Sequence, residues 1–247
     1  MASTSEIGHA KNIASLNELL SVVTSYGLTY NPSKESIQLT GLQRLLDNAK
    51  KVNDEVNVSF ALSSNAIAAR KVAFKPFSKS ITRVFNALKA SDTPVQVDDT
   101  AKTLVRKIQG TRATAKKTEE EKKALLALGK ETKENSSSQM SINSRLENYD
   151  KLIQLLSTIE LYKPNEEDLK VTSLRAHHTD LKAKNNAAIN TDIALTNSRN
   201  NRDIIFYKDL TGLYDLTFDV KVYVKSVYGA TSPQYKQVSK IKFTKPH

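Results

Sequence analysis

The chain has 247 residues, of which 39% are hydrophobic and 26% are charged. This length suits one large or two small domains, and the hydrophobic share lies slightly below that of an average globular protein. Cysteine is absent, which excludes disulfides, cysteine-ligated zinc, iron–sulfur clusters and thiol catalysis. The net charge of +11 favours polyanionic partners such as nucleic acid, anionic lipid or an acidic protein, although the same charge also keeps a protein soluble.

The N-terminal quarter of the chain predicts two helices separated by a turn. Residues 13–27 are amphipathic and end near a glycine, and a Tyr-x-Pro turn follows at Tyr30. We expect Ser33 to cap the next helix. That helix continues to Phe74, as one long helix or two stacked ones, because this span contains no proline and a single glycine.

Two shorter helices are predicted next, over residues 75–93 and 98–110, with Gly110 as the stop signal of the second. Residues 113–141 then read as a charged helical linker. Within it, residues 116–133 carry Glu and Lys at helical spacing, which is typical of an exposed helix.

The second half of the chain repeats the first at an offset of 132 residues. Tyr30-x-Pro32 recurs as Tyr162-x-Pro164, and the polar and apolar positions that follow correspond. Further identities in the same register are Glu35 with Glu167, Thr40 with Thr172, Leu42 with Leu174, Lys50 with Lys182, Asn53 with Asn185, Arg70 with Arg202, and Phe74 with Phe206. The sequence therefore predicts an internal duplication, with a period too long for solenoid repeats of the TPR or HEAT type.

These observations predict an all-α protein, an extended helical bundle made of two tandem duplicated units. The first helical-bundle unit covers residues 1–112, the charged linker 113–141, and the second unit with a basic C-terminal tail 142–247. In the second unit we expect Asn165 to cap the long helix, in the place of Ser33.

Two segments of the second unit are ambiguous between helix and another structure. Residues 211–229 are rich in β-branched and aromatic residues, so a strand competes with the helix that the first copy favours. The C-terminal phrase at 238–243, Val-Ser-Lys-Ile-Lys-Phe, alternates apolar and basic residues and predicts either a short strand or an extended tail.

Three phrases of the second unit carry a resemblance to a known family. They are SSQMSINSRLENYDKLIQLL, YKPNEEDLK and VKVYVKSVYGATSPQYKQVSKIKF, which begin at Ser137, Tyr162 and Val220. They resemble an uncharacterised family of duplicated helical proteins from Bacteroidetes-type bacteria, closely in the second unit and more loosely in the first. The resemblance implies a bacterial source and an all-helical build, and it carries no activity, cofactor or site residue with it.

No motif for catalysis or cofactor binding is present. The chain lacks Gly-x-Gly-x-x-Gly, P-loop and Gly-x-Ser-x-Gly phrases. His177 and His178 are adjacent, so on a helix they point about 100° apart and chelate one metal poorly. Neither histidine has a glutamate three residues before it, as a di-iron bundle requires. We therefore expect a protein that is not an enzyme and that holds no metal or cofactor.

Positive charge is clustered along the chain. No acidic residue lies between Glu55 and Asp92, and the C-terminal tail is also rich in lysine. The candidate polyanion-binding residues are Arg70, Lys71, Lys75, Lys79, Arg83, Arg106, Lys107, Lys236, Lys240 and Lys242. Phosphate binding needs such a surface, and the interleaved tyrosines of the tail suit stacking on bases. The competing interpretation is that these cations line the solvent faces of amphipathic helices and that the tyrosines lie in the core.

Residues 56–69 contain no charged side chain and allow two interpretations. They form either the buried centre of the long helix or the membrane-facing segment of an α-helical pore-forming protein. No apolar run approaches the roughly 18 residues of a membrane-spanning helix, and the N-terminus shows no Sec-type signal peptide. We therefore expect a cytoplasmic location.

We expect a non-enzymatic helical scaffold or interaction protein that docks on a polyanion or an acidic partner through basic helix faces. The expected partners are nucleic acid or another polyanion, bound non-specifically, and further copies of the chain in a homo-oligomer. The alternatives are a membrane-active bundle of the pore-forming kind and a small-molecule binder with a pocket in the bundle core.

Overall fold

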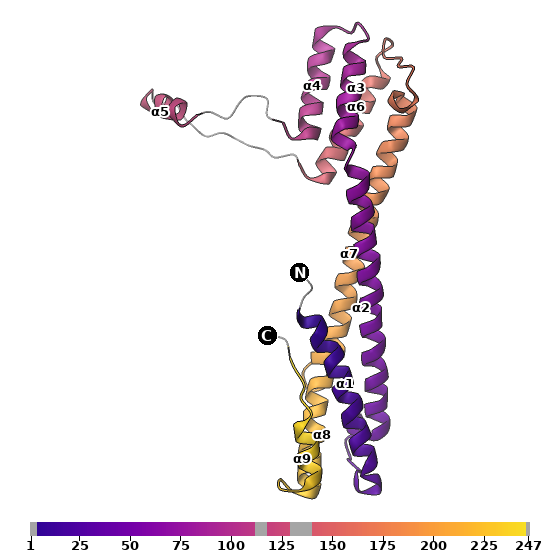
Figure 1. Ribbon diagram of the computed structural model, residues 1–247, viewed down its shortest axis with the longest axis vertical. Helices are drawn as coiled ribbons and strands as arrows, with labels where there is room; N and C mark the ends of the chain where they lie inside the picture. The colour runs from indigo at the N-terminus through magenta and orange to yellow at the C-terminus, as the bar shows by residue number, and fades with distance from the viewer. Residues whose placement is uncertain (1–3, 112–117, 129–139, 246–247) are drawn as a thin grey trace. The chain divides into compact units, whose positions relative to one another are not determined.

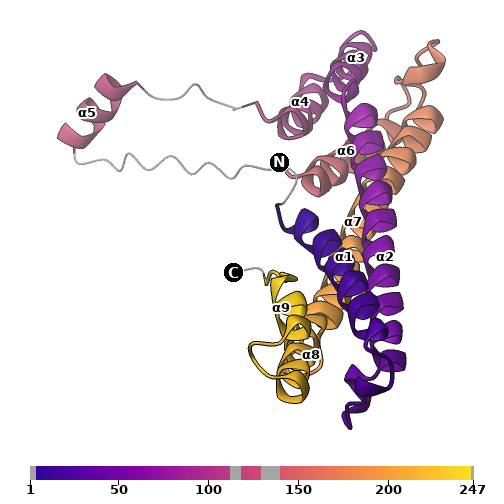
Figure 2. The same ribbon diagram turned by 60° about the horizontal axis from the view of Figure 1, so that its bottom comes forward.

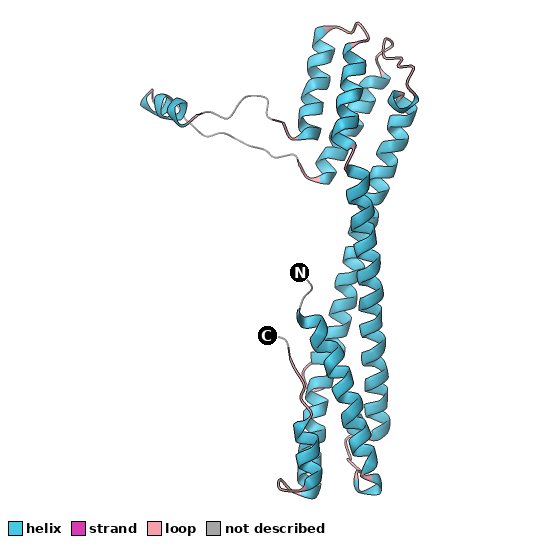
Figure 3. Ribbon diagram, viewed as in Figure 1, coloured by secondary structure: helices cyan, strands magenta, loops and turns pink. Residues whose placement is uncertain are grey.

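The computed structural model describes residues 4–111, 118–128 and 140–245, which form helices and turns without any β-strand (Figure 3). The prediction of an all-α protein is therefore confirmed. The α-helices labelled in Figure 1 are α1 (Thr4–Ser25), α2 (Leu39–Phe74), α3 (Phe77–Lys89), α4 (Val95–Gln109), α5 (Glu119–Ala127), α6 (Ile142–Ser157), α7 (Val171–Tyr207), α8 (Leu213–Tyr228) and α9 (Pro233–Lys240). Three short 3₁₀ helices also occur: η1 (Gly27–Thr29), η2 (Glu35–Ile37) and η3 (Glu167–Leu169).

The chain folds into two compact units. Unit 1 consists of Met1–Ser64 together with Asn190–His247, and unit 2 consists of Asn65–Ile189. Helices α2 and α7 contribute to both units, because the boundary falls inside each of them. These compact units differ from the two sequence copies, 1–112 and 142–247. The division into copies stays a prediction.

The core of unit 1 joins helices from both ends of the chain. In α1 the buried residues Leu16, Leu19, Leu20 and Val23 follow the three- and four-residue spacing of an apolar helix face. That face packs against η2, the first part of α2, the end of α7, and helices α8 and α9. Figure 2 shows α1, α8 and α9 side by side.

The core of unit 2 joins α3, α4, α6 and the first part of α7. In α3 the buried residues Phe77, Ile81, Val84 and Leu88 again follow helical spacing, as do Tyr149, Leu152, Ile153 and Leu156 in α6. Helices α3, α4 and α6 lie next to one another in Figure 1.

A tyrosine organises the entry to each long helix. The Tyr30 hydroxyl donates to the Ile37 carbonyl at 2.6 Å, and the Tyr162 hydroxyl donates to the Leu169 carbonyl at 2.8 Å. Burial raises the pKa of Tyr162 to about 12, with Asp168 and Glu166 adding to the effect, so this hydroxyl remains a donor at neutral pH. Each bond closes a loop around a 3₁₀ turn, η2 or η3.

The prediction that Ser33 and Asn165 cap the long helices is wrong, because η2 and η3 precede these helices. Because η2 and η3 come first, α2 and α7 begin at Leu39 and Val171, and neither Ser33 nor Asn165 caps a helix. Gly41 explains how closely η2 lies on α2, since a Cβ at this position would stand 2.3 Å from the Glu35 carbonyl oxygen. A glycine is needed there by this close approach.

The remaining predictions of secondary structure have mixed outcomes. The span from Leu39 to Phe74 is one helix rather than two, and α4 ends before Gly110, whose φ of 73° closes the helix as predicted. Residues Leu213–Tyr228 are helical, as the first copy favours. Of the two alternatives for 238–243, a short strand or an extended tail, the strand does not form: α9 extends to Lys240, and 241–245 continue without helix or strand. Of the predicted linker helix, α5 is described and most of the rest lies outside the described residues.

We expect Tyr30→Phe and Tyr162→Phe each to lower the free energy of unfolding by about 1–3 kcal/mol, because each leaves a buried carbonyl without its donor. Urea unfolding followed by circular dichroism measures the loss. Tyr235→Phe is the matched control, since it retains the ring that lies beneath the Lys225 ammonium. Equal stability of all three variants and the parent would contradict the role of the two turns.

Candidate polyanion interface

The predicted basic residues of unit 2 fall into three groups, and Arg70 and Arg83 form the first. The Arg83 guanidinium forms a two-pronged ion pair with the Asp168 carboxylate, one prong of which is the 3.2 Å contact from Nη2 to Oδ1. Arg70 is half-buried, and its Nη1 donates to the Asn185 Oδ1 at 3.2 Å. Both arginines therefore serve contacts within the unit, although Arg83 remains exposed.

Three lysines form the second group. Lys71 lies in the last turn of α2, Lys75 in the turn that follows, and Lys79 in α3. All three are exposed, and none has an acidic partner within 4 Å in the described parts of the chain. Their charges are therefore open to an external anion. We call these residues the lysine cluster.

Arg106 and Lys107 occupy the last turn of α4, where their charges can stabilise the helix itself. A positive charge near a helix C-terminus interacts favourably with the exposed carbonyl groups of that end. Arg106 is half-buried and Lys107 is exposed, so only Lys107 adds a fully accessible charge to this part of unit 2.

Arg145 of α6 is a cation that sequence reasoning missed. Its Nε donates to the Ile108 carbonyl at 2.9 Å, and its Nη2 donates to the Ser78 hydroxyl at 3.3 Å. The guanidinium also lies over the Phe77 ring, 5.1 Å from the ring centre. Burial lowers the pKa of Arg145. Arg145 thus ties α6 to α4 and α3, and no local pattern around it signals that role.

The predicted basic residues of the tail, Lys236, Lys240 and Lys242, lie in unit 1 and are exposed. Around them, other lysines are used internally. The Lys221 ammonium donates to the Ile241 carbonyl, and burial, with a contribution from Lys242, lowers the pKa of Lys221. The Lys225 ammonium lies 5.7 Å from the centre of the Tyr235 ring.

The tail tyrosines proposed for base stacking make contacts inside unit 1. The Tyr223 hydroxyl accepts from the Asn31 amide at 3.1 Å, and its ring meets Tyr30 edge-on. Tyr228 bonds the Thr29 hydroxyl and packs against Tyr26. The interpretation of these rings as packing residues accounts for these contacts.

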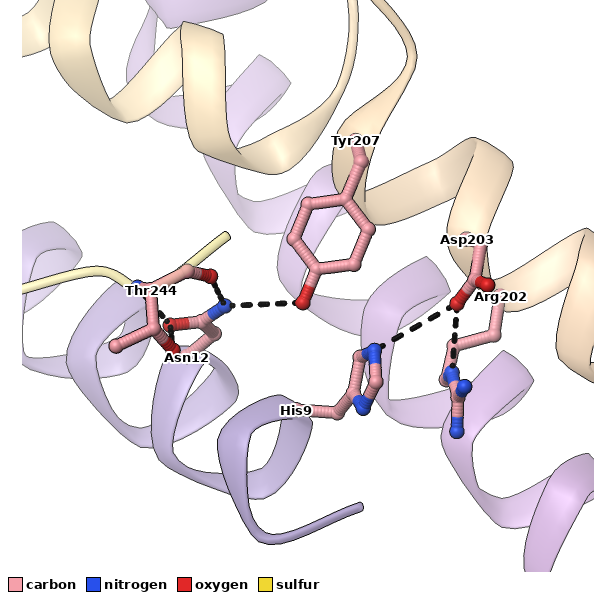
Figure 4. A network of polar contacts seen from close by, with 6 residues as sticks. All are labelled: His9, Asn12, Arg202, Asp203, Tyr207 and Thr244. Atoms are coloured by element: carbon pink, nitrogen blue, oxygen red, sulfur yellow. Dashed lines mark hydrogen bonds and ion pairs between the residues drawn. The ribbon is translucent and has the colours of Figure 1, made fainter. Parts of the chain in front are cut away.

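Unit 1 also contains a partly buried polar network that the sequence did not indicate (Figure 4). The His9 side chain is 1% exposed, and its Nε2 lies 3.6 Å from the Asp203 carboxylate. Figure 4 shows that His9 and Arg202 approach the same oxygen of Asp203, with the Arg202 Nε at 3.1 Å. The His9 ring packs edge-on against Phe206.

In the same network, Asn12 holds the C-terminal segment. Its Nδ2 donates to the Thr244 carbonyl at 2.8 Å, and its Oδ1 accepts from the Thr244 amide at 2.9 Å. The Nδ2 also lies 3.4 Å from the Tyr207 hydroxyl, which comes from α7. A single amide thus pairs with the backbone of a residue 232 positions away in the sequence.

The adjacent histidines of α7, His177 and His178, both pack against the ring of Tyr149. The Tyr149 hydroxyl and the His177 Nδ1 lie 3.2 Å apart, and both rings contact each other edge-on. Burial lowers the pKa of His177; the neighbouring Asp180 opposes this shift and His178 adds to it. Across residues 4–111, 118–128 and 140–245, no three histidine or acidic side chains are placed to hold a metal ion.

The described residues form a shallow, open hollow on the surface. The hollow lies in unit 1 and is lined by Lys51, Asp54, Glu55, Val58, Ser59 and Ser198. Among the described helices, none combines the length and the apolar character needed to cross a membrane.

Comparison of the chain with protein-family models, curated proteins and solved structures yields no match. The resemblance to the bacterial helical family therefore stays a prediction.

We expect the stability of the protein to fall as the pH drops below 6.5, in part because of His177. Its folded-state pKa is lower than the unfolded value of 6.5, so the neutral ring favours the fold above that pH and protonation opposes it below. The variant His177→Leu, which carries the residue of the matching position Leu45, removes this titration. The melting temperature of the parent should therefore fall more than that of the variant when the pH is lowered from 7 to 5. A constant difference would show that His177 does not cause the change.

We expect Asn12→Ala to lower the free energy of unfolding by about 1–3 kcal/mol, because it leaves the Thr244 amide and carbonyl without partners. Amide hydrogen exchange should become faster in residues 241–245. Asn17→Ala, on the exposed face of the same helix, is the control. Unchanged exchange in the C-terminal segment would contradict the role of Asn12.

Proposed function

We propose that the protein is a non-enzymatic helical interaction protein that docks on a polyanion through the lysine cluster of unit 2. The observation that supports this proposal is the exposure of Lys71, Lys75 and Lys79 without an acidic partner in the described structure. The sequence between Glu55 and Asp92 contains no acidic residue, so this part of unit 2 has no carboxylate of its own to offset the lysines.

The distribution of charge favours unit 2 over unit 1. Residues 65–189 contain 23 Lys and Arg against 15 Asp and Glu, a net charge of +8, whereas residues 1–64 and 190–247 contain 14 against 11, a net charge of +3. Long-range attraction of a polyanion follows net charge, so it acts mainly on unit 2.

We further propose that the chain arose by duplication of a helical segment. In support, η2 and η3 occur at the same offset of 132 residues as the sequence matches, and so do the two tyrosine-to-carbonyl bonds. The buried residues of the long helices correspond as well, Leu42 with Leu174 and Ala49 with Leu181. Common descent of the two copies accounts for this agreement.

A membrane-active function is the second candidate, and one observation favours it. The uncharged stretch 56–69 is not a buried helix centre: only Val56 and Ser63 are buried there, whereas Val58, Phe60 and Leu62 are at least half exposed. Exposed apolar side chains of this size suit contact with lipid or with another protein.

We expect the triple variant Lys71→Glu, Lys75→Glu, Lys79→Glu to bind labelled duplex DNA at least tenfold more weakly than the parent. The slope of log affinity against log salt should fall by about 3, since three phosphate contacts are lost. Fluorescence anisotropy at several salt concentrations measures both quantities.

The matched control reverses Lys236, Lys240 and Lys242 in unit 1, which changes the net charge by the same amount. It should retain affinity within about threefold. Equal losses in both variants would reduce the effect to net charge, and a parent protein that binds no DNA would overturn docking on nucleic acid. Dye release from anionic vesicles by the parent would favour the membrane-active candidate.

A further inference from the structure

Each core of this protein is assembled from both sides of the linker that contains α5. In unit 1, α1, η2 and the first part of α2 precede the linker, whereas the end of α7, α8 and α9 follow it. In unit 2, α3 and α4 precede the linker, whereas α6, η3 and the first part of α7 follow it. Neither core is therefore complete within one half of the chain.

The polar contacts of unit 1 cross between the halves in the same way. The Tyr26 hydroxyl donates to the Gln234 carbonyl at 3.1 Å, and the Lys34 ammonium lies 2.6 Å from the Asp219 carboxylate. The bonds between Asn12 and Thr244 join the same two halves. Helix α1 and the turns that follow it thus have polar partners in α8, α9 and the segment after α9.

The polar contacts of unit 2 also join residues that precede the linker to residues that follow it. Arg145 of α6 reaches the Ile108 carbonyl at the end of α4, and Arg83 of α3 pairs with Asp168 in η3. Arg70 of α2 reaches Asn185 of α7. Here the second half of the chain supplies α6 and the first half supplies α3 and α4.

A half of the chain on its own would leave two apolar faces uncovered. In the N-terminal half, the face of α1 with Leu16, Leu19 and Val23 would lack α8 and α9, and the face of α3 with Ile81 and Val84 would lack α6. The C-terminal half carries the complementary faces. The apolar helix faces of each half are therefore covered by helices of the other half, and its polar side chains find their partners there.

We propose that the two halves of the chain are mutual binding partners, each completing both units of the other, and that the linker is not needed to hold them together. If the two halves are copies, as proposed above, the arrangement is that of a dimer with exchanged helices that has been fused into one chain. The association itself rests on the two cores, so failure of DNA binding would leave it unaffected.

Cleavage of the intact protein tests this association. A recognition sequence for a specific protease is inserted between Ala127 and Met140 of the full chain, and the purified protein is cut under native conditions. We expect the two fragments to elute together at the size of the uncut protein and to retain its helical circular dichroism. Separation of the fragments, whether folded or unfolded, would overturn the proposal, and so would homodimers of a single fragment.

A pair of matched substitutions in the uncut protein tests which helices depend on which. Leu19 of α1 and Leu152 of α6 are both fully buried leucines, one in each core. Leu19→Ala should accelerate amide hydrogen exchange in α8 and α9 by roughly 30-fold or more and leave α3 and α4 within about threefold. Leu152→Ala should have the reverse effect.

The opposite outcome would identify the alternative fold. If each sequence copy formed its own bundle, Leu19→Ala would loosen α3 and α4 and spare α8 and α9. Val23→Ala and Leu156→Ala occupy the next buried positions of the same two faces and serve if a leucine variant does not fold. Exchange that follows sequence copies rather than compact units would overturn the proposal.

Discussion

The packing of α1 and α6 is the constraint on which both units depend. Each helix has one apolar face, and most of the stability of such a helix in a protein comes from the packing of that face. Leu16, Leu19, Leu20 and Val23 are buried in a core that includes η2 and the first part of α2, but also helices that lie more than 180 residues away in the sequence. Because neither unit can bury such a face with neighbouring sequence alone, the two ends of the chain are required in unit 1 and the two sides of the linker in unit 2.

Polar side chains then select one arrangement among the many that apolar faces allow. Apolar contacts are non-directional, whereas a buried backbone group must meet a donor or acceptor at a defined position. Asn12 meets the amide and carbonyl of Thr244, and Arg145 meets the Ile108 carbonyl. In both units the residue lies on the first helix of one half of the chain and reaches the end of the other half, before or after the linker. Register in each unit is therefore fixed by a side chain rather than by the length of a loop.

The sequence predicted those features that depend on local chemistry. The long helices follow from spans without proline, and the apolar faces of amphipathic helices such as α1 follow from their periodicity. The partners of those faces could not be predicted, because periodicity identifies an apolar face but not the helix that covers it. The start of α2 was misplaced for a similar reason: the bond from Tyr30 to a carbonyl seven residues ahead stabilises a turn where a Ser cap was expected.

The candidate interface shows the same limit. Clustering of cations was visible in the sequence, but the Asp168 that neutralises Arg83 is 85 residues away, and the Asn185 that engages Arg70 is 115 residues away. Arg145 and His9 were missed because a buried cation or histidine is recognised by its surroundings, which come from other helices. Long-range pairing thus decided which of the predicted residues make contacts within the protein.

The internal contacts of the arginines also limit the kind of recognition that the exposed cations can perform. Arginine reads phosphate and guanine through a planar, two-pronged geometry, and the structure uses its best-placed arginines for internal contacts. The lysines that remain are flexible, strongly hydrated point charges, which contact phosphate groups without reading bases. A surface of this kind neutralises a polyanion by charge and gains little from its sequence. If the lysine cluster docks on a polyanion, as we propose, this docking should therefore be non-specific.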